Sequence, residues 1–222
     1  MEQSAVSAAN LNFDADASTS ADNALQKYQS FDDLAGQWRI HDLKTRMALR
    51  QGDRAEAEVQ VSELETLSVQ LSSRHIFYQT HLLSGQVNED PQHFADALRF
   101  ASTSLEQAVV HTYLGTTDKA IELIQDDLKN NVTNNPADRA FIYYRAGLSS
   151  GSSIHYQLAL QYYQLAEDAR GVADTLVRLA RQNAENNRLQ EAKVFAYRAI
   201  KALRAIGDTD RANSVNAWQL SL

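Results

Sequence analysis

The sequence predicts an all-α fold, and three observations carry that prediction. Alanine, leucine and glutamine are abundant, and all three residue types favour helices. The 222 residues include only 2 prolines and 8 glycines, which is few for a chain rich in strands and turns. Apolar residues recur at steps of three and four, the period of an amphipathic helix. The length fits one large domain or two small ones, with a sizeable core.

Turn and capping signals divide the chain into elements. Residues 1–20 have no apolar period and predict a flexible leader, whereas residues 21–222 predict a single helical-repeat domain. Gln51-Gly52-Asp53 ends one helix, and Pro91 begins another because proline suits the first helical turn. The expected helices cover 22–28 (opened by Ser20 or Asp22), 31–51, 54–71, 75–83 (ending at Gly85), 91–101, 104–114, 117–128, 137–148, 156–169, 171–185, 189–206 and 208–222.

Small residues recur with a period of 33 in the C-terminal half. The pairs are Gly147 and Ala180, Ala159 and Ala192, and Ala166 and Ala199. Small side chains let two helices approach closely, so the period predicts stacked helical hairpins. The register slips between residues 75 and 105, which predicts a short helix or another kind of hairpin there.

This pattern resembles the tetratricopeptide repeat (TPR) family, most clearly over residues 103–206. The family repeat has a large residue at position 4, a small one at 8, Ala at 20, an aromatic or apolar residue at 24 and Ala at 27. The two best repeats, 140–172 and 173–206, carry Tyr143, Gly147, Ala159, Tyr163 and Ala166, and Leu176, Ala180, Ala192, Ala196 and Ala199. The resemblance implies a right-handed superhelix (solenoid) of about five antiparallel hairpins, with 208–222 as a C-terminal capping helix.

The sequence offers no set of residues for catalysis, metal binding or cofactor binding. The absence of cysteine excludes disulfides and zinc–thiolate sites. There is no glycine-rich phosphate loop, no H-E-x-x-H and no G-x-S-x-G. His75 and His81 are spaced poorly for a shared metal. We therefore expect no enzyme. A tyrosine cluster is expected to pack helices together rather than to stack on nucleic-acid bases: Tyr143, Tyr144, Tyr156, Tyr162 and Tyr163.

The TPR resemblance implies a binding groove, because the first helix of each repeat lines the concave surface in that family. The matching positions predict a groove of Phe141, Tyr144, Arg145, Arg178 and Arg181. Guanidinium groups bind carboxylates, so the expected ligand is an acidic peptide segment or a free C-terminus. The alternative is that these arginines pair with Asp174, Glu185 or Glu106 and simply solvate the face.

These features predict a non-catalytic scaffold that binds a protein or peptide partner. The alternative is a regulatory domain that senses a ligand or peptide. A net charge of −7 argues against nucleic acid as the partner, and no apolar run is long enough for a transmembrane segment. Self-association as a homo-oligomer is also compatible. The N-terminus lacks a signal peptide, which indicates the cytoplasm, or a bacterial periplasmic or outer-membrane lipoprotein whose signal was removed.

Overall fold

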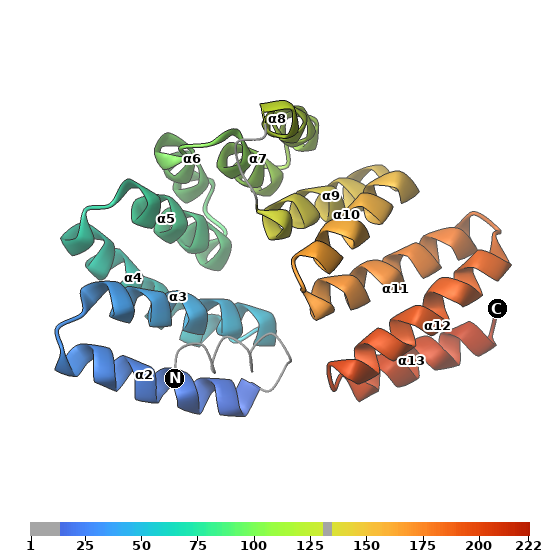
Figure 1. Ribbon diagram of the computed structural model, residues 1–222, viewed down its shortest axis with the longest axis horizontal. Coiled ribbons are helices and arrows are strands. Elements are labelled where there is room, and N and C mark those ends of the chain that lie inside the picture. Colours follow the sequence, from blue (N-terminus) through green and yellow to red (C-terminus); the bar gives the residue numbers. More distant parts are fainter. Residues whose placement is uncertain (1–13, 131–134) are drawn as a thin grey trace. The chain divides into compact units, whose positions relative to one another are not determined.

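The computed structural model describes residues 14–130 and 135–222, which are helical throughout apart from short connections (Figure 1). The all-α prediction is confirmed for these residues, which form twelve helices and no strand. The helices are α2 (Asp14–Ser30), α3 (Leu34–Gln51), α4 (Arg54–Leu71), α5 (Arg74–Asn88), α6 (Pro91–Phe100), α7 (Ser104–Tyr113), α8 (Thr117–Asn130), α9 (Pro136–Ser150), α10 (Ser153–Leu165), α11 (Ala169–Glu185), α12 (Leu189–Ala205) and α13 (Thr209–Leu220).

The chain forms two compact units that divide after Leu114. The N-terminal unit holds α2 to α7, and the C-terminal unit holds α8 to α13. Within each unit, every helix packs against the next helix in the sequence. Consecutive packing of this kind follows from short connections, since a two-residue turn forces neighbouring helices to run antiparallel.

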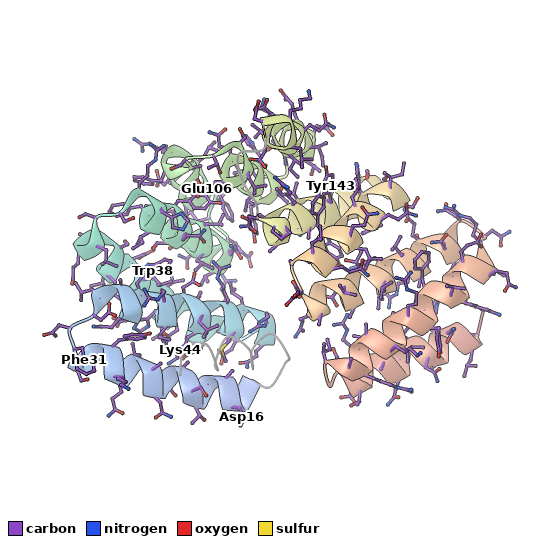
Figure 2. All side chains as sticks on the ribbon, viewed as in Figure 1. Asp16, Phe31, Trp38, Lys44, Glu106 and Tyr143 are labelled. Carbon is purple, nitrogen blue, oxygen red and sulfur yellow. The ribbon has the colours of Figure 1, made fainter. Side chains whose placement is uncertain are left out.

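The core of the N-terminal unit is built on α3, α4 and α5. Trp38, Leu64 and Leu83 are buried in one apolar cluster (Trp38 is labelled in Figure 2). The Trp38 indole N–H donates to the Thr80 hydroxyl at 3.1 Å, so the buried polar end of the ring has a partner. This bond links α3 to α5, two helices that are not adjacent in the sequence.

The core of the C-terminal unit joins α11, α12 and α13. Buried residues recur at helical spacing along α11 and α12 and continue onto Ala212 and Val215 of α13. Trp218 packs on the edge of this cluster. Asp208 begins α13, because its carboxylate accepts the Arg211 backbone N–H at 3.3 Å. The predicted final helix therefore exists, and its apolar face covers α12.

A buried ion pair joins α8 to α9. Arg139 Nη2 donates to Asp127 Oδ2 at 2.7 Å, and the two side chains are 9% and 0% exposed. The Arg139 guanidinium also lies 5.9 Å from the centre of the Tyr162 ring on α10. The buried Arg139 side chain thus links α9 to the helix before it and to the helix after it.

Several connections share one form, in which a left-handed residue is followed by a capping aspartate. Asp53, Asp168 and Asp208 each follow a residue with positive φ and accept the backbone N–H three residues on. Their backbone N–H groups also close the end of the preceding helix. The same turn geometry therefore ends one helix and starts the next within two residues.

Helical glycines lie directly beneath aromatic rings of the neighbouring helix. A Cβ atom at Gly147 would lie 2.7 Å from the Tyr156 ring, and one at Gly171 would lie 2.3 Å from the Tyr163 ring. Real Cβ atoms do not approach other atoms this closely, so these contacts need glycine. The prediction that small residues mark points of close helix approach is confirmed at Gly147.

Some helix boundaries differ from the predicted ones for local physical reasons. α2 begins at Asp14, within the predicted leader 1–20, while the rest of that leader lies outside the described residues. α5 continues through Gly85 to Asn88, because Gly85 is buried in a helix beneath Phe94 and has no positive φ. In the segment with the register slip, residues 75–105, α6 has only ten residues, and so does α7, which begins at the end of that segment.

Candidate functional site

Positive charge is concentrated on one hairpin of this acidic protein. Residues 169–205, which span α11 and α12, contain eight basic and three acidic residues, whereas the whole chain has a net charge of −7. A local excess of cations favours anionic ligands even when the protein as a whole is acidic. The hairpin is therefore the place to look for a binding site.

A pocket of ≈ 380 Å³ opens beside this hairpin within the C-terminal unit. Its size lies within the usual range of ligand pockets. Three helices supply its lining: Tyr144 from α9; Asp174, Val177, Arg178 and Arg181 from α11; and Arg211, Ser214 and Val215 from α13. Asp174, Arg178 and Arg181 follow one another at steps of four and three, so α11 presents all three on one face.

An ion pair closes one side of the pocket. Arg211 Nη2 donates to Asp174 Oδ1, which ties α13 to α11, and its Nη1 donates to Asp208 Oδ2 at 3.3 Å. Burial lowers the pKa of Arg211, but its hydrogen bonds and the charges of Asp174 and Asp208 outweigh that effect and raise it. Arg211 therefore stays charged and is already bound to two carboxylates.

The other two arginines face the pocket without a carboxylate bound to them. A hydrogen bond with the Tyr144 hydroxyl raises the pKa of Arg178. Arg181 is exposed and, within residues 14–130 and 135–222, has neither an ion pair nor a hydrogen bond through its side chain. Two cations one helical turn apart thus remain available to an anion.

Tyr144 is held in place by the aromatic residues around it. Its ring makes edge-to-face contacts with Tyr156 at 5.9 Å and with Tyr163 at 6.4 Å between ring centres. On the other side of the cluster, Tyr143 stacks on Tyr162 at 5.7 Å. The prediction that these tyrosines pack helices together is confirmed. It also explains why Tyr144 can position Arg178, since the ring that carries the hydroxyl is fixed.

The pocket contains three of the five residues predicted for the groove. Tyr144, Arg178 and Arg181 line it, whereas Phe141 and Arg145 are not among its lining residues. Arg145 lies on α9 and is exposed. The alternative expectation paired these arginines with Asp174, Glu185 or Glu106. In the structure, the carboxylate of Asp174 hydrogen-bonds Arg211 instead, and that of Glu106 contacts His75.

The sequence analysis missed the contribution of α13 to the pocket. Arg211 and Ser214 lie on the pocket side of the helix that was expected only to cap the stack. A signal was present: Arg211 follows a capping aspartate and directly precedes Ala212, whose side chain is buried against the core. A polar residue next to a core position on a terminal helix lies at the edge of the interface, where it can reach the preceding hairpin.

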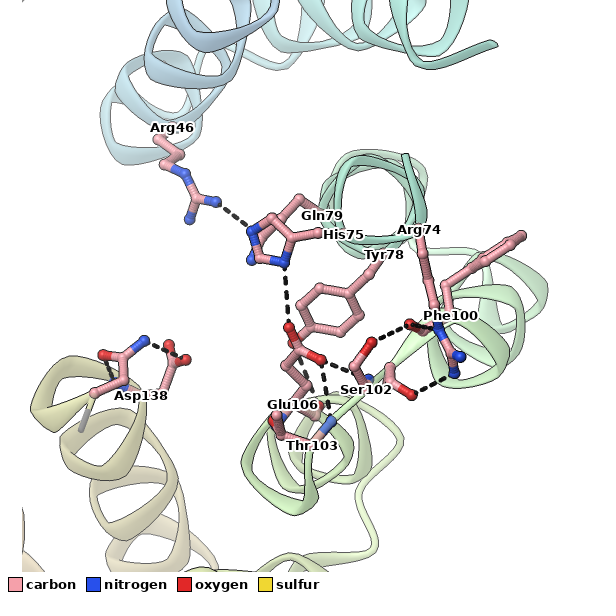
Figure 3. Close-up of polar contacts among 12 residues, drawn as sticks. Arg46, Arg74, His75, Tyr78, Gln79, Phe100, Ser102, Thr103, Glu106 and Asp138 are labelled. Atoms are coloured by element: carbon pink, nitrogen blue, oxygen red, sulfur yellow. Dashed lines mark hydrogen bonds and ion pairs between the residues drawn. The ribbon is translucent and has the colours of Figure 1, made fainter. Parts of the chain in front are cut away.

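The N-terminal unit contains a polar cluster around Glu106 (Figure 3). Its carboxylate accepts the backbone N–H groups of Ser102 at 2.6 Å and Thr103 at 3.3 Å and contacts His75 Nδ1 at 3.2 Å. The Thr103 hydroxyl accepts the Glu106 N–H in return, which makes a capping box at the start of α7. We assign this cluster a structural role, because its main partners are backbone groups.

His81 and His93 form a second titratable group, on α5 and α6. Their ring centres are 5.9 Å apart, and His81 also stacks on Phe100. Burial lowers the pKa of His81, while Asp96 and Glu65 oppose that shift and His93 adds to it. In the part of the chain that the structure describes, no three metal-binding side chains gather closely enough to hold an ion.

None of the helices that the structure describes is both long and apolar enough to cross a bilayer. Comparison of the chain with models of protein families found no matching family, and comparison with curated proteins found no significant match.

Proposed function

We propose that the protein is a non-catalytic binding module whose C-terminal unit docks an acidic peptide segment or a free C-terminus. The observation that carries this proposal is the pair Arg178 and Arg181 at the wall of the pocket, with Arg181 lacking any side-chain partner among the described residues. A carboxylate accepts two parallel N–H hydrogen bonds from one guanidinium. The two arginines can therefore bind two carboxylates, one each, or bind a single carboxylate from two sides.

The remaining lining of the pocket fits a binding role better than a chemical one. The carboxylate of Asp174 forms an ion pair with Arg211, so Asp174 is a poor general base. No histidine is present among the lining residues to activate Ser214. Val177 and Val215 add apolar surface for the side chains that flank an acidic group. These features favour recognition of a peptide over turnover of a small molecule.

We also propose that the C-terminal unit consists of TPR-like repeats, and hence that its hairpins continue as a right-handed superhelix. Burial at most of the repeated positions supports this, since Ala159, Ala180, Ala192 and Ala199 are completely inaccessible to solvent, whereas Ala166 is half-buried at the end of α10. The contact of Gly147 with Tyr156 adds to it. Under this proposal α13 plays the part of a capping helix. A place in the bacterial envelope stays a prediction.

The test measures binding of a fluorescent peptide ending in four glutamates, with the same peptide amidated at its C-terminus as the second probe. We expect Arg178→Gln and Arg181→Gln each to weaken binding about tenfold, because a hydrogen bond to a charged group contributes about 1.5 kcal/mol or more. Arg145→Gln is the matched control, since Arg145 is an exposed arginine of the same unit outside the pocket. Equal losses in all three variants, or no binding of either peptide, would contradict the proposal.

A second candidate, a domain that senses a ligand or peptide, is favoured by the ion pair between Arg211 and Asp174. A ligand carboxylate that competes for Arg211 would release α13 from α11. Hydrogen exchange distinguishes the two functions under saturating peptide. A sensor would exchange faster along 209–220 when the peptide binds, whereas a rigid docking module would exchange more slowly or at the same rate there.

A further inference from the structure

The two halves of the chain differ strongly in charge. Residues 1–114 contain 16 acidic and 8 basic residues, whereas residues 115–222 contain 12 acidic and 13 basic ones. The difference is sharpest between two helices. α4 has four acidic residues and one basic residue, and α12 has four basic residues and one acidic residue. Opposite charges on separate surfaces of one protein favour contact between copies.

α4 exposes an acidic face with two large apolar side chains. Its buried residues, among them Ala57, Leu64 and Leu67, face the core of the N-terminal unit. The opposite side carries Val59 and Val69, which are 57% and 68% exposed. We define the acidic face of α4 as Glu58, Val59, Ser62, Glu63, Thr66 and Val69, all of them exposed.

The cations of α12 are arranged in a comparable way around apolar groups. Its buried residues pack on α11 and α13, and Val194 and Tyr197 on the other side are 59% and 54% exposed. We define the basic face of α12 as Val194, Tyr197, Arg198, Lys201 and Arg204. The Lys201 ammonium lies 4.8 Å from the centre of the Tyr197 ring. Among the described residues, no ion pair involves Arg198, Lys201 or Arg204.

We propose that the basic face of α12 binds the acidic face of α4 from a second copy of this chain. Each face combines charges of one sign with exposed apolar side chains, and each is complementary to the other. Glu63 has no side-chain partner within the described residues, so it can accept a cation without breaking an existing bond. Glu58 gives up at most an exposed contact with Arg54 at 3.2 Å, which contributes little.

The charge pattern favours an antiparallel pairing of the two helices. The acidic residues of α4 all lie before Thr66, and Arg198, Lys201 and Arg204 lie in the second half of α12. Setting Val69 opposite Val194 places Thr66 opposite Tyr197 and Lys201 opposite Ser62, between Glu58 and Glu63. A parallel pairing that sets Val59 opposite Val194 would place Arg198 opposite Glu63, but it would leave Lys201 and Arg204 opposite Thr66 and Val69, beyond the last acidic residue of α4.

Because the two faces are different, each copy keeps one face of each kind available for another contact. The interface is therefore heterologous, and it closes into a ring or continues as an open chain. Charge contributes much of the attraction, so association weakens as salt shortens the screening length, from about 10 Å at 0.1 M to about 3 Å at 1 M.

The experiment measures molar mass by light scattering and sedimentation over a range of concentrations at low salt. One variant, R198E/K201E, makes both faces acidic, and another, E58K/E63K, makes both faces basic. We expect wild type to associate and each variant alone to stay monomeric. An equimolar mixture of the variants should associate again, because the acidic face on α12 of one then meets the basic face on α4 of the other. Circular dichroism checks that both variants remain helical.

Each of the other outcomes overturns the proposal. Wild type that stays monomeric at low salt has no such interface. Association that survives both charge reversals uses another surface. Variants that fail to associate when mixed show that α4 and α12 are not each other's partners. If wild type stays monomeric but binds vesicles of phosphatidylglycerol, and R198E/K201E does not, then the basic face serves an anionic lipid surface instead.

Discussion

Replacing Asp127 with asparagine removes one charge of the ion pair that joins α8 to α9 and leaves the size of the side chain nearly unchanged. Arg139 Nη2 lies 2.7 Å from Asp127 Oδ2, and the side chains of Asp127 and Arg139 are 0% and 9% exposed. Arg139 cannot lose its proton, so the variant keeps a guanidinium in the interior after the ion pair with Asp127 is lost. The Tyr162 ring face, at 5.9 Å, compensates only in part.

The expected loss is about 3 kcal/mol of the free energy of unfolding. Breaking a buried pair by removing one partner costs about 3–5 kcal/mol, and the lower value applies because asparagine can still accept a hydrogen bond. Replacing both residues should cost less, since the interior then holds no charge at either position. We therefore expect Asp127→Leu with Arg139→Leu to be more stable than Asp127→Asn alone.

Urea unfolding followed by circular dichroism measures the loss. The neighbouring Asp126 provides a matched control, because it is exposed and its carboxylate accepts the Asn130 side-chain amide at 3.2 Å. Asp126→Asn should change the free energy of unfolding by less than about 0.5 kcal/mol. If the two single variants prove equally stable, then Arg139 reaches water or another acceptor, and the argument from burial is wrong.

Three further predictions concern stability. Gly171→Ala should destabilise by about 1 kcal/mol in urea unfolding, because the clash with the Tyr163 ring outweighs the higher helix propensity of alanine; a more stable variant would mean that the ring moves aside easily. Burial lowers the pKa of His81 in the folded protein, so the unfolded chain binds a proton at this histidine more readily than the folded chain does. Stability should therefore fall as the pH drops below about 6.5. In melting experiments at several pH values, His81→Gln should make that fall smaller. Thr103→Ala should cost about 1 kcal/mol in urea unfolding by removing the cap of α7, while Thr103→Ser should keep most of it.

The sequence predicted helix existence well, because local chemistry determines it here. Gly52-Asp53 and Gly207-Asp208 contain both the left-handed residue that ends one helix and the carboxylate that begins the next. Gly85 misled the same reasoning, since a glycine is equally suited to a turn and to a close helix contact. Only the position of Phe94, nine residues later on the neighbouring helix, distinguishes the two cases.

The candidate site was predicted only in part, because a pocket depends on packing between hairpins. The spacing of Arg178 and Arg181 on one helix is local and could be read from the sequence. The contact between Asp174 and Arg211 spans 37 residues and depends on how α13 lies on α11. Arg145 was predicted from its repeat position, which matches that of Arg178, but it does not line the pocket. The α9 residue that lines the pocket is Tyr144.

The basic hairpin supports two proposals that stand on different helices, and each supplies a control for the other. Arg178 and Arg181 face the pocket from α11, whereas Arg198 and Lys201 lie on the exposed side of α12. If overall positive charge were the cause of binding, any of the four substitutions would weaken peptide binding and self-association alike. If geometry is the cause, α11 variants should change only the affinity for the peptide and α12 variants only the molar mass. Crossed measurements on the same four residues therefore separate specific recognition from the general attraction of a cationic surface.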